Sequence, residues 1–423
     1  PAARRRRGPA RRPSWYCYAV DGDGAHAGMN RSPTASMSAT LSRLKIRAIG
    51  FPGPDSGRDI GIDALKGFAI LLVIFGHSLE IADGGLFVPN PSLRHHVGTL
   101  LYTFHMPLFM FLAGYVMAGK PVRPGKSFLR LVVPFFSWMV VRFLVFTPPS
   151  RWGEIGRFTW RGVWLMAGAP LWFLWTLYMC YLLLLAAQLT GRRWRHGEGL
   201  TLLALFVLVN LAPTSVLGVP QLQYYFAFFS LGYLAAKHKD RILGVKPAVR
   251  TAALVLAPAA WLGLFFAVYY RLGEVMAPVP AREVFSIPAL ALERYGLALL
   301  GILASFALLA AVRAARARRV EASFGWLGLA TMDLYVTHGI LIHASFGAGW
   351  VKVFSAFFAG LAGGLALAYA VLRPWRLLSY LFLGRSYRDG PRYRLELSPV
   401  TGGAVPEADA SRDPGGIATD DRL

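Results

Sequence analysis

Residues 63–77, with the sequence DALKGFAILLVIFGH, predict a membrane-spanning helix that carries ionisable side chains near both ends. Such groups are costly in hydrocarbon, so three of them in one span indicate a function. At about 100° per residue, Lys66 and His77 project from nearly the same face of the helix, and Asp63 falls close to that face. This polar stripe is therefore expected to face a pocket or a partner helix rather than lipid.

The composition of the whole chain also indicates a membrane protein. Of its 423 residues, 55% are hydrophobic and only 16% are charged, whereas soluble domains carry about 25% charged residues. The net charge is +23, but Lys and Arg come in short clusters between long apolar runs, which argues against nucleic acid as a partner. The two cysteines, Cys17 and Cys180, are far apart and have no metal-site spacing.

Ten apolar segments are long enough to cross a bilayer, which takes about 20 residues of helix. They cover residues 62–81, 97–118, 128–147, 166–188, 199–217, 222–237, 249–270, 288–312, 324–346 and 350–372. The predicted fold is all-α, a polytopic membrane protein with about ten transmembrane helices. We expect a disordered basic arm at 1–58, a transmembrane domain at 59–384 and a disordered tail at 385–423.

The distribution of basic residues predicts the orientation. With both termini in the cytoplasm, Lys and Arg in the inner loops outnumber those in the outer loops about two to one. His77, His105 and His338 then reach a similar level in the outer half of the membrane, while Lys66 lies near the cytoplasmic side. We therefore expect a multi-pass protein of a bacterial plasma membrane, with a site that can be reached from both sides.

The first helix supplies the main candidate groups. His77 is a candidate base, because the pKa of imidazole lies near neutrality. Lys66, together with Arg58 and Asp63, would form an inner mouth that attracts anions. The alternative is that Lys66 extends to the membrane interface and that His77 bonds to another helix.

The second helix carries FHMPLFMFLAGY at residues 104–115. Pro107 removes a helical hydrogen bond beside His105 and so exposes backbone polar groups that a cavity could use. The alternative is a kinked packing helix with a buried histidine.

A late segment, GLATMDLYVTH at residues 328–338, holds an acidic residue inside a span. Asp333 needs a partner there, and it could orient a histidine or pair with Arg142. Tyr335 and His338 share a face at i, i+3. A structural ion pair and a catalytic role both remain open for Asp333.

Aromatic residues begin the fourth segment, in PLWFLWTLY at residues 170–178. Trp172, Trp175 and Tyr178 could stack on a sugar, but such residues are also common anchors at the membrane interface. Both interpretations stay open. The chain shows no phosphate-binding glycine loop, no GxSxG and no zinc spacing.

Together, these motifs resemble the acyltransferase 3 family, and its fucose 4-O-acetylase-like branch in particular. The resemblance covers about residues 58–372. It implies a body of ten or eleven helices that transfers an acyl group, expected to be acetyl, from cytoplasmic acyl-CoA to a hydroxyl of a sugar or glycan on the far side of the membrane. Lys66 stands where the family has Arg, with ten residues between it and His77, which keeps the charge but loses the bidentate guanidinium.

The resemblance also suggests roles for the candidate residues. The donor site would comprise Arg58, Asp63, Lys66, Lys126 and Arg130, of which the four basic residues would attract the phosphates of the donor. The catalytic group would comprise His77, His105, Asp333, Tyr335 and His338, with His77 acting as the base or as a transient acyl carrier and His105 or Tyr335 stabilising the oxyanion. The acceptor would contact Trp172, Trp175 and Tyr178. No metal is expected.

Two other classes of membrane protein compete with this interpretation. A secondary transporter would also place His and Asp at mid-depth, but the chain shows no convincing internal repeat. A polysaccharide export or flippase component would usually bring larger outer loops. The expected partners are therefore the lipid bilayer, acyl-CoA and a glycan acceptor.

Overall fold

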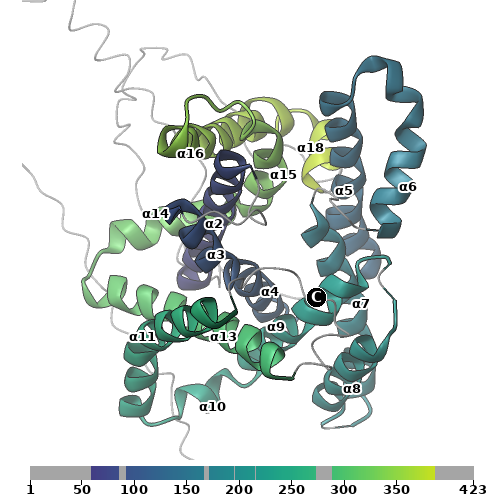
Figure 1. Ribbon diagram of the computed structural model, residues 1–423. Coiled ribbons are helices and arrows are strands. Elements are labelled where there is room, and N and C mark those ends of the chain that lie inside the picture. The colour runs from purple at the N-terminus through teal and green to yellow at the C-terminus, as the bar shows by residue number, and fades with distance from the viewer. Residues whose placement is uncertain are drawn as a thin grey trace, which may run out of the picture. The chain divides into compact units, whose positions relative to one another are not determined.

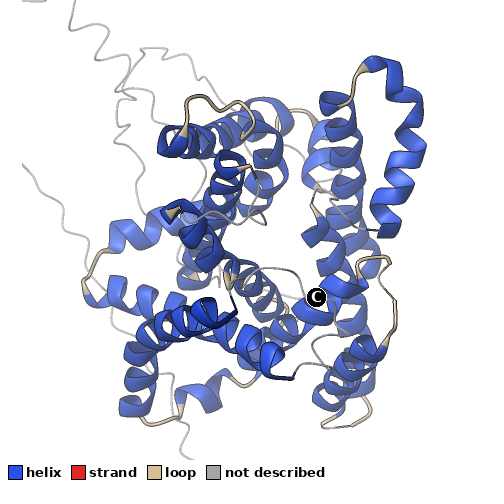
Figure 2. Ribbon diagram, viewed as in Figure 1, coloured by secondary structure: helices blue, strands red, loops and turns tan. Residues whose placement is uncertain are grey.

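All regular structure in the described part of the chain is helical, as Figure 2 shows. The computed structural model describes residues 59–84, 92–165, 171–194, 196–214, 216–272 and 288–385. The all-α prediction is confirmed. The predicted arm at 1–58 lies outside the described residues. Of the predicted tail at 385–423, only Arg385 is described.

The helices follow one another along the chain with short connections (Figure 1). They are α2 (Ile60–Asp83), α3 (Leu93–Tyr102), α4 (His105–Tyr115), α5 (Pro124–Phe146), η2 (Pro149–Glu154), α6 (Ile155–Leu165), α7 (Trp172–Gly191), α8 (Gly197–Leu211), α9 (Val219–Lys237), α10 (Lys239–Leu243), α11 (Pro247–Leu272), α13 (Pro288–Ala314), α14 (Arg318–Leu329), α15 (Thr331–Leu341), α16 (Gly349–Phe358), η3 (Ala359–Gly363), α17 (Gly364–Ala366), η4 (Leu367–Leu372) and α18 (Arg376–Leu383). The stretch from α16 to η4 is one continuous rod in which η3 and η4 are π-helical.

Seven helices within the described residues are long and apolar enough to cross a membrane. They are Ile60–Asp83, Leu93–Tyr115, Pro124–Phe146, Trp172–Gly191, Pro247–Val268, Leu292–Ala314 and Gly349–Leu372. Their outer surfaces are apolar: Val255 and Leu292, for example, are 68% and 76% exposed. Such contiguous apolar surface is typical of helices that contact lipid. The predicted cytoplasmic location of both termini stays a prediction.

The remaining three predicted spans differ from expectation. Residues 199–217 form the shorter helix α8. The segment at 222–237 forms α9, which carries Gln221, Gln223 and Lys237 among its apolar residues. The predicted span at 324–346 is broken at Ala330 into α14 and α15, where the Thr331 hydroxyl donates to the carbonyl of Gly328 at 2.8 Å. The count of ten spans is therefore not confirmed.

The second predicted helix also differs locally. The break lies just before His105 rather than after it, since α3 ends at Tyr102 and α4 begins at His105. Pro107 thus falls in the first turn of α4, where the missing N–H has no helical partner in any case.

Helix α2 lies among α14, α15, α16, α3 and α4, and it contacts all of them (Figure 1). Its apolar side chains Ile70 and Ile74 are fully buried, as are Leu108 of α4 and Phe229 of α9 in the same core. The polar face of α2 therefore lies inside the helical body, as the stripe predicted.

Glycines let the central helices touch through their backbones. A Cβ atom at Gly67 would collide with the carbonyl oxygen of Phe324, and one at Gly328 would collide with that of Asp63, so α2 and α14 cross without intervening side chains. Gly114 and Gly232 make the same kind of contact between α4 and α9. Small residues at crossings are the usual means of close helix packing in membranes.

The π-helical rod packs on α15 in a similar way. A Cβ atom at Gly360 would meet side-chain atoms of Ile342 and Ile74, and one at Gly364 would meet the Thr337 hydroxyl at 2.8 Å. The rod ends at Leu372. The next residue, Arg373, lies beside α15 because its side chain donates a hydrogen bond to Asp333 of that helix.

The backbone contact at Gly67 predicts a stability difference between two glycine-to-alanine exchanges. Gly67→Ala should lower the free energy of unfolding by about 1–3 kcal/mol, because the added methyl group overpacks a rigid crossing. Gly263→Ala in α11 is the control, since its Cβ would meet no atom within 4 Å. Thermal unfolding of both purified variants in detergent measures the difference, and equal midpoints would contradict the packing role.

Candidate functional site

The start of α2 is fixed by a side-chain cap. The Asp59 carboxylate accepts from the backbone N–H groups of Gly61 and Ile62, at 3.0 and 3.4 Å. The helix then runs without interruption to Gly84, whose φ of 76° ends it. Because the helix is regular between these ends, Lys66 and His77 stay on one face, as their spacing predicts.

His77 is paired with a carboxylate one turn further along α2. The distance from His77 Nδ1 to Glu80 Oε2 is 3.0 Å. The Tyr102 hydroxyl, from the end of α3, donates to the same Glu80 oxygen at 3.2 Å and lies 3.3 Å from His77 Nδ1. Gly76 permits this approach, because a Cβ atom there would lie 3.0 Å from the Tyr102 ring. Both side chains of the pair are about one-third exposed, so a substrate can reach them.

Two further imidazoles surround this pair. The ring of His338, on α15, has its centroid 5.5 Å from that of His77, and the ring of His105 has its centroid 4.6 Å from that of Tyr102. Both rings are buried, and their Nδ1 atoms lie 2.7 Å from the Leu101 carbonyl (His105) and 3.0 Å from the Leu334 carbonyl (His338). A carbonyl only accepts, so each Nδ1 donates, and the neutral ring then has an acceptor at Nε2. The structure thus brings together the three histidines that were predicted to share a level.

Tyr335 links this group to the aromatic start of α7. Its ring centroid lies 5.8 Å from that of His338 and 5.4 Å from that of Phe173. The neighbouring Trp172 has its ring 5.0 Å from that of Tyr225 in α9. Of the three predicted sugar-stacking residues, Trp172 is the one whose ring contacts Phe173, which in turn contacts Tyr335.

Trp175 and Tyr178 are placed differently. The Trp175 indole donates to the carbonyl of Leu217 at 2.9 Å, and its ring lies 5.7 Å from that of Phe135. The Tyr178 ring lies 5.8 Å from that of Phe128. Both side chains thus pack against α5 and stabilise the contact between helices α5 and α7.

Asp333 forms a buried ion pair with a residue that the sequence analysis did not single out. Arg373 donates to Asp333 Oδ2 from Nε at 2.9 Å and also from a terminal nitrogen, and Arg385 lies 3.4 Å from the same oxygen. The side chains of Asp333 and Arg373 are only 4% and 10% exposed. The suggested pairing with Arg142 is wrong, because Arg142 lies over the ring of Phe146 and within electrostatic range of Glu80.

Asp63 and Lys66 form the expected polar group at the Asp59 end of α2. Lys66 Nζ lies 3.0 Å from Asp63 Oδ1, and both side chains are largely buried. Arg58, the third member of the predicted inner mouth, lies outside the described residues.

Lys126 and Arg130 lie on α5 and are exposed. The backbone of Arg130 touches Gly384, the residue directly before Arg385. Asp333 lies on the Asp63 side of His338, since Gly328 contacts Asp63 and His338 contacts His77.

Comparison with known proteins identifies the family. A family model described as an acyltransferase domain matches residues 59–373. The chain belongs to the acyltransferase 3 family. This acyltransferase is also 30% identical to the nodulation protein NolL of Sinorhizobium fredii over 202 residues, which are 43% of this chain and 50% of that protein. It is 25% identical to the nodulation protein NolL of Mesorhizobium japonicum over 358 residues, or 78% of this chain and 90% of that protein.

The chain thus spans half the length of the first relative and nearly all of the second. No solved structure matches the acyltransferase. The family membership confirms an O-acyltransferase with membrane-spanning helices; the fucose 4-O-acetylase-like branch stays a prediction.

Among the described residues, no group of three or more His, Cys, Asp or Glu side chains could hold a metal ion. Cys180 is fully buried, and burial raises the cost of forming the thiolate that a nucleophile needs.

Four contact residues of the site were missed from the sequence: Glu80, Tyr102, Arg373 and Arg385. Glu80 had a visible signal, because it follows His77 by three residues on the same helix. Tyr102 also precedes His105 by three residues. Arg373 and Arg385 had no such signal, since they meet Asp333 only through the fold.

The buried ion pair makes a prediction about stability. Asp333→Ala should lower the free energy of unfolding by about 3–5 kcal/mol, because it leaves the Arg373 guanidinium buried without its carboxylate. The double variant Asp333→Asn/Arg373→Gln should recover much of this loss. Glu154→Gln, which breaks an exposed pair with Arg151, is the control and should leave thermal unfolding in detergent unchanged. A double variant as unstable as Asp333→Ala would contradict the pairing argument.

Proposed function

We propose that this acyltransferase moves an acyl group, expected to be acetyl, from cytoplasmic acyl-CoA to a hydroxyl of a sugar or glycan on the far side of the membrane. One observation carries the proposal, namely the pairing of His77 with Glu80 beside Tyr102 and next to the ring of His338. An imidazole held by a carboxylate is a suitable base for a hydroxyl group, which is unreactive until its proton is removed.

The pairing defines the proton path. With Nδ1 donating to Glu80, Nε2 of His77 accepts the proton of the acceptor hydroxyl. The hydroxyl oxygen bonds to the thioester carbon, the carbon–sulfur bond breaks, and the leaving thiolate takes the proton from the imidazolium. Glu80 stabilises the imidazolium between these steps, and Tyr102 holds Glu80 in place. His77 is the base in this scheme, and the acyl group passes directly to the acceptor.

Tyr335 is the better candidate for stabilising the oxyanion of the tetrahedral intermediate. Nδ1 of His105 already donates to the Leu101 carbonyl, so its neutral ring has no second N–H to offer. The phenol of Tyr335 carries a donor and lies on the same helix as His338, whose ring contacts that of His77. The proposal therefore assigns the oxyanion to Tyr335.

Basic residues on the Asp63 side of His77 support access of the donor from the predicted cytoplasmic side. Arg373 and Arg385 both contact the carboxylate of Asp333, and the exposed Arg130 lies on α5, with its backbone close to Gly384. Lys66 lies on the same side and is paired with Asp63. Positive charge of this kind attracts the phosphates of CoA and can bind them.

Aromatic rings beyond Tyr335 support a sugar as the acceptor. Trp172 and Tyr225 have their ring centroids 5.0 Å apart, and Trp172 adjoins Phe173, which contacts Tyr335. The apolar face of a sugar stacks well on such rings. Resemblance to the fucose 4-O-acetylase-like branch makes a fucoside the first acceptor to test.

A test of the base uses the purified full-length chain in detergent, with radiolabelled acetyl-CoA and a panel of methyl glycosides that includes a fucoside. His77→Ala should lower acetyl transfer at least about 10²-fold, because it removes the base. Glu80→Gln should lower it at least about tenfold, because the amide cannot stabilise the imidazolium.

The matched control for the base is Glu154→Gln, the same exchange at an exposed residue. It should leave the rate unchanged, and all variants should elute as the wild type does in size exclusion. Full transfer by a folded His77→Ala protein would overturn the assignment. Movement of a sugar across vesicles without release of CoA would instead indicate a transporter.

The donor site makes a second kinetic prediction. Arg385→Gln should raise the KM for acetyl-CoA about tenfold, since one charge-assisted hydrogen bond to a phosphate is lost, and should leave kcat nearly unchanged. Arg376→Gln is the control, because Arg376 is an exposed arginine at the start of α18, the helix that ends two residues before Arg385. An equal effect of both exchanges would remove Arg385 from the donor site.

A further inference from the structure

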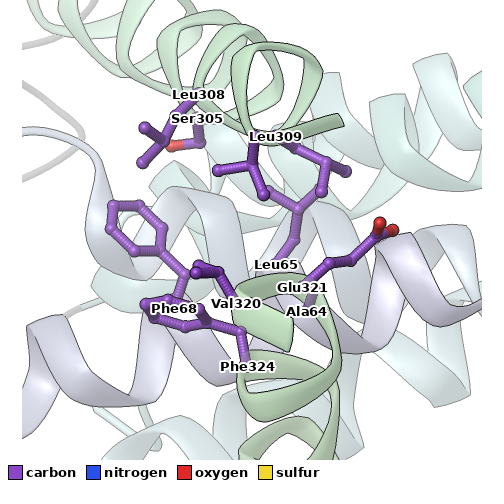
Figure 3. A pocket seen from close by; sticks show the side chains of 10 residues that line it. Ala64, Leu65, Phe68, Ser305, Leu308, Leu309, Val320, Glu321 and Phe324 are labelled. Atoms are coloured by element: carbon purple, nitrogen blue, oxygen red, sulfur yellow. The ribbon is translucent and has the colours of Figure 1, made fainter. Parts of the chain in front are cut away.

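A cavity lies between α2, α13 and α14, away from the histidine group (Figure 3). It is partly open to the outside, and the space of about 340 Å³ between its atoms includes open solvent. Its walls are apolar: Leu65 and Phe68 come from α2, Leu309 from α13, and Val320 and Phe324 from α14. The cavity therefore suits an apolar group.

The polar side chains in the wall are already bonded within the protein. The Ser305 hydroxyl donates to the carbonyl of Gly301 at 2.9 Å. The Glu321 carboxylate accepts from Arg313 at 2.7 and 2.9 Å, at the edge of the group of side chains in Figure 3. An occupant of the cavity thus finds no polar partner inside it, which excludes a sugar or a nucleotide as a good fit.

The cavity is separate from the proposed catalytic site. On α2, Leu65 and Phe68 project about 100° and 200° away from Lys66, which shares its face with His77. A molecule in the cavity consequently lies on the opposite side of α2 from the proposed site of acyl transfer. It is not the acyl group of the donor.

Three exposed arginines lie in the chain segment between two residues of the cavity wall. Arg316 is in the connection between α13 and α14, and Arg318 and Arg319 are the first two residues of α14. This segment is bounded by Val312 and Val320, and both of these valines line the cavity. An apolar cavity with a cluster of positive charge close by in the chain matches the two chemically different parts of a lipid.

We propose that the cavity and the three arginines form a binding site for an anionic phospholipid. An acyl chain of the lipid fills the apolar cavity, and the phosphate of its headgroup contacts Arg316, Arg318 and Arg319. Charge complementarity selects an anionic headgroup over a zwitterionic one, because basic pockets between transmembrane helices favour negatively charged lipids. A bound chain would also pack against both α2 and α14, the pair of helices that holds the catalytic face in position.

The test is native mass spectrometry of the full-length protein in detergent with added dioleoyl phosphatidylglycerol or dioleoyl phosphatidylcholine. The wild type should retain the first lipid in preference to the second. Exchange of Arg316, Arg318 and Arg319 to Gln should lower retention of phosphatidylglycerol about fivefold for each arginine that contacts the phosphate. Leu308→Trp, which fills the cavity from an exposed position, should lower it as well.

The control is Arg192→Gln/Arg193→Gln, a second exposed basic cluster that does not line the cavity. It should retain the lipid as the wild type does. If Leu308→Trp does not fold, Val320→Trp fills the cavity from another exposed residue.

The proposal is overturned by equal retention of both lipids, by an equal loss in the Arg192/Arg193 variant, or by full retention in a folded cavity variant. Displacement of the lipid by inorganic phosphate, with no effect of the cavity variant, would indicate a site for the headgroup alone and would also overturn it.

Discussion

The crossing of α2 and α14 is the contact on which the arrangement of the candidate site depends. At Gly67 and Gly328 the two backbones touch, so the helices have almost no freedom to slide or separate there. One residue after α14 ends, α15 begins, and its His338 reaches the ring of His77 on α2. A close crossing near one end of α2 thus sets the distance between two imidazoles near the other end.

The polar groups inside the body follow from a second constraint, the cost of charge in hydrocarbon. Each of the three acidic groups of the candidate site has a partner: Asp63 has Lys66, Glu80 has His77 and Tyr102, and Asp333 has Arg373 and Arg385. The three groups differ in accessibility. The side chains of Asp333 and Arg373 are almost fully buried, whereas His77 and Glu80 are each about one-third exposed, as a site that receives a substrate must be.

The sequence was sufficient to predict those features that depend on one helix at a time. The apolar runs predicted an all-helical membrane protein, and the spacing of Lys66 and His77 predicted their common face. Helix rise predicted that three histidines share a level, and the structure brings their rings into one group. The quoted motifs were enough to find the family.

Features that depend on contacts between distant segments could not be predicted in this way. Arg373 follows Asp333 by 40 residues, and no periodicity connects the two. Hydropathy also cannot distinguish one long helix from two short ones, so residues 324–346 were predicted as a single span although the chain breaks at Ala330. Trp175 and Tyr178 share a motif with Trp172, but only tertiary contacts show that they pack on α5.

The π-helical rod has a consequence for how this chain can change during evolution. A π turn contains an extra residue, so η3 and η4 shift the phase of every side chain that follows them. Loss of one residue between Ala359 and Leu372 would turn Arg373 by about 100° around the rod axis, away from Asp333. Local repacking can absorb a substitution in this segment, but it cannot absorb a change in the length of the segment. The number of residues between the glycines and Arg373 should therefore vary less among relatives than the identity of those residues.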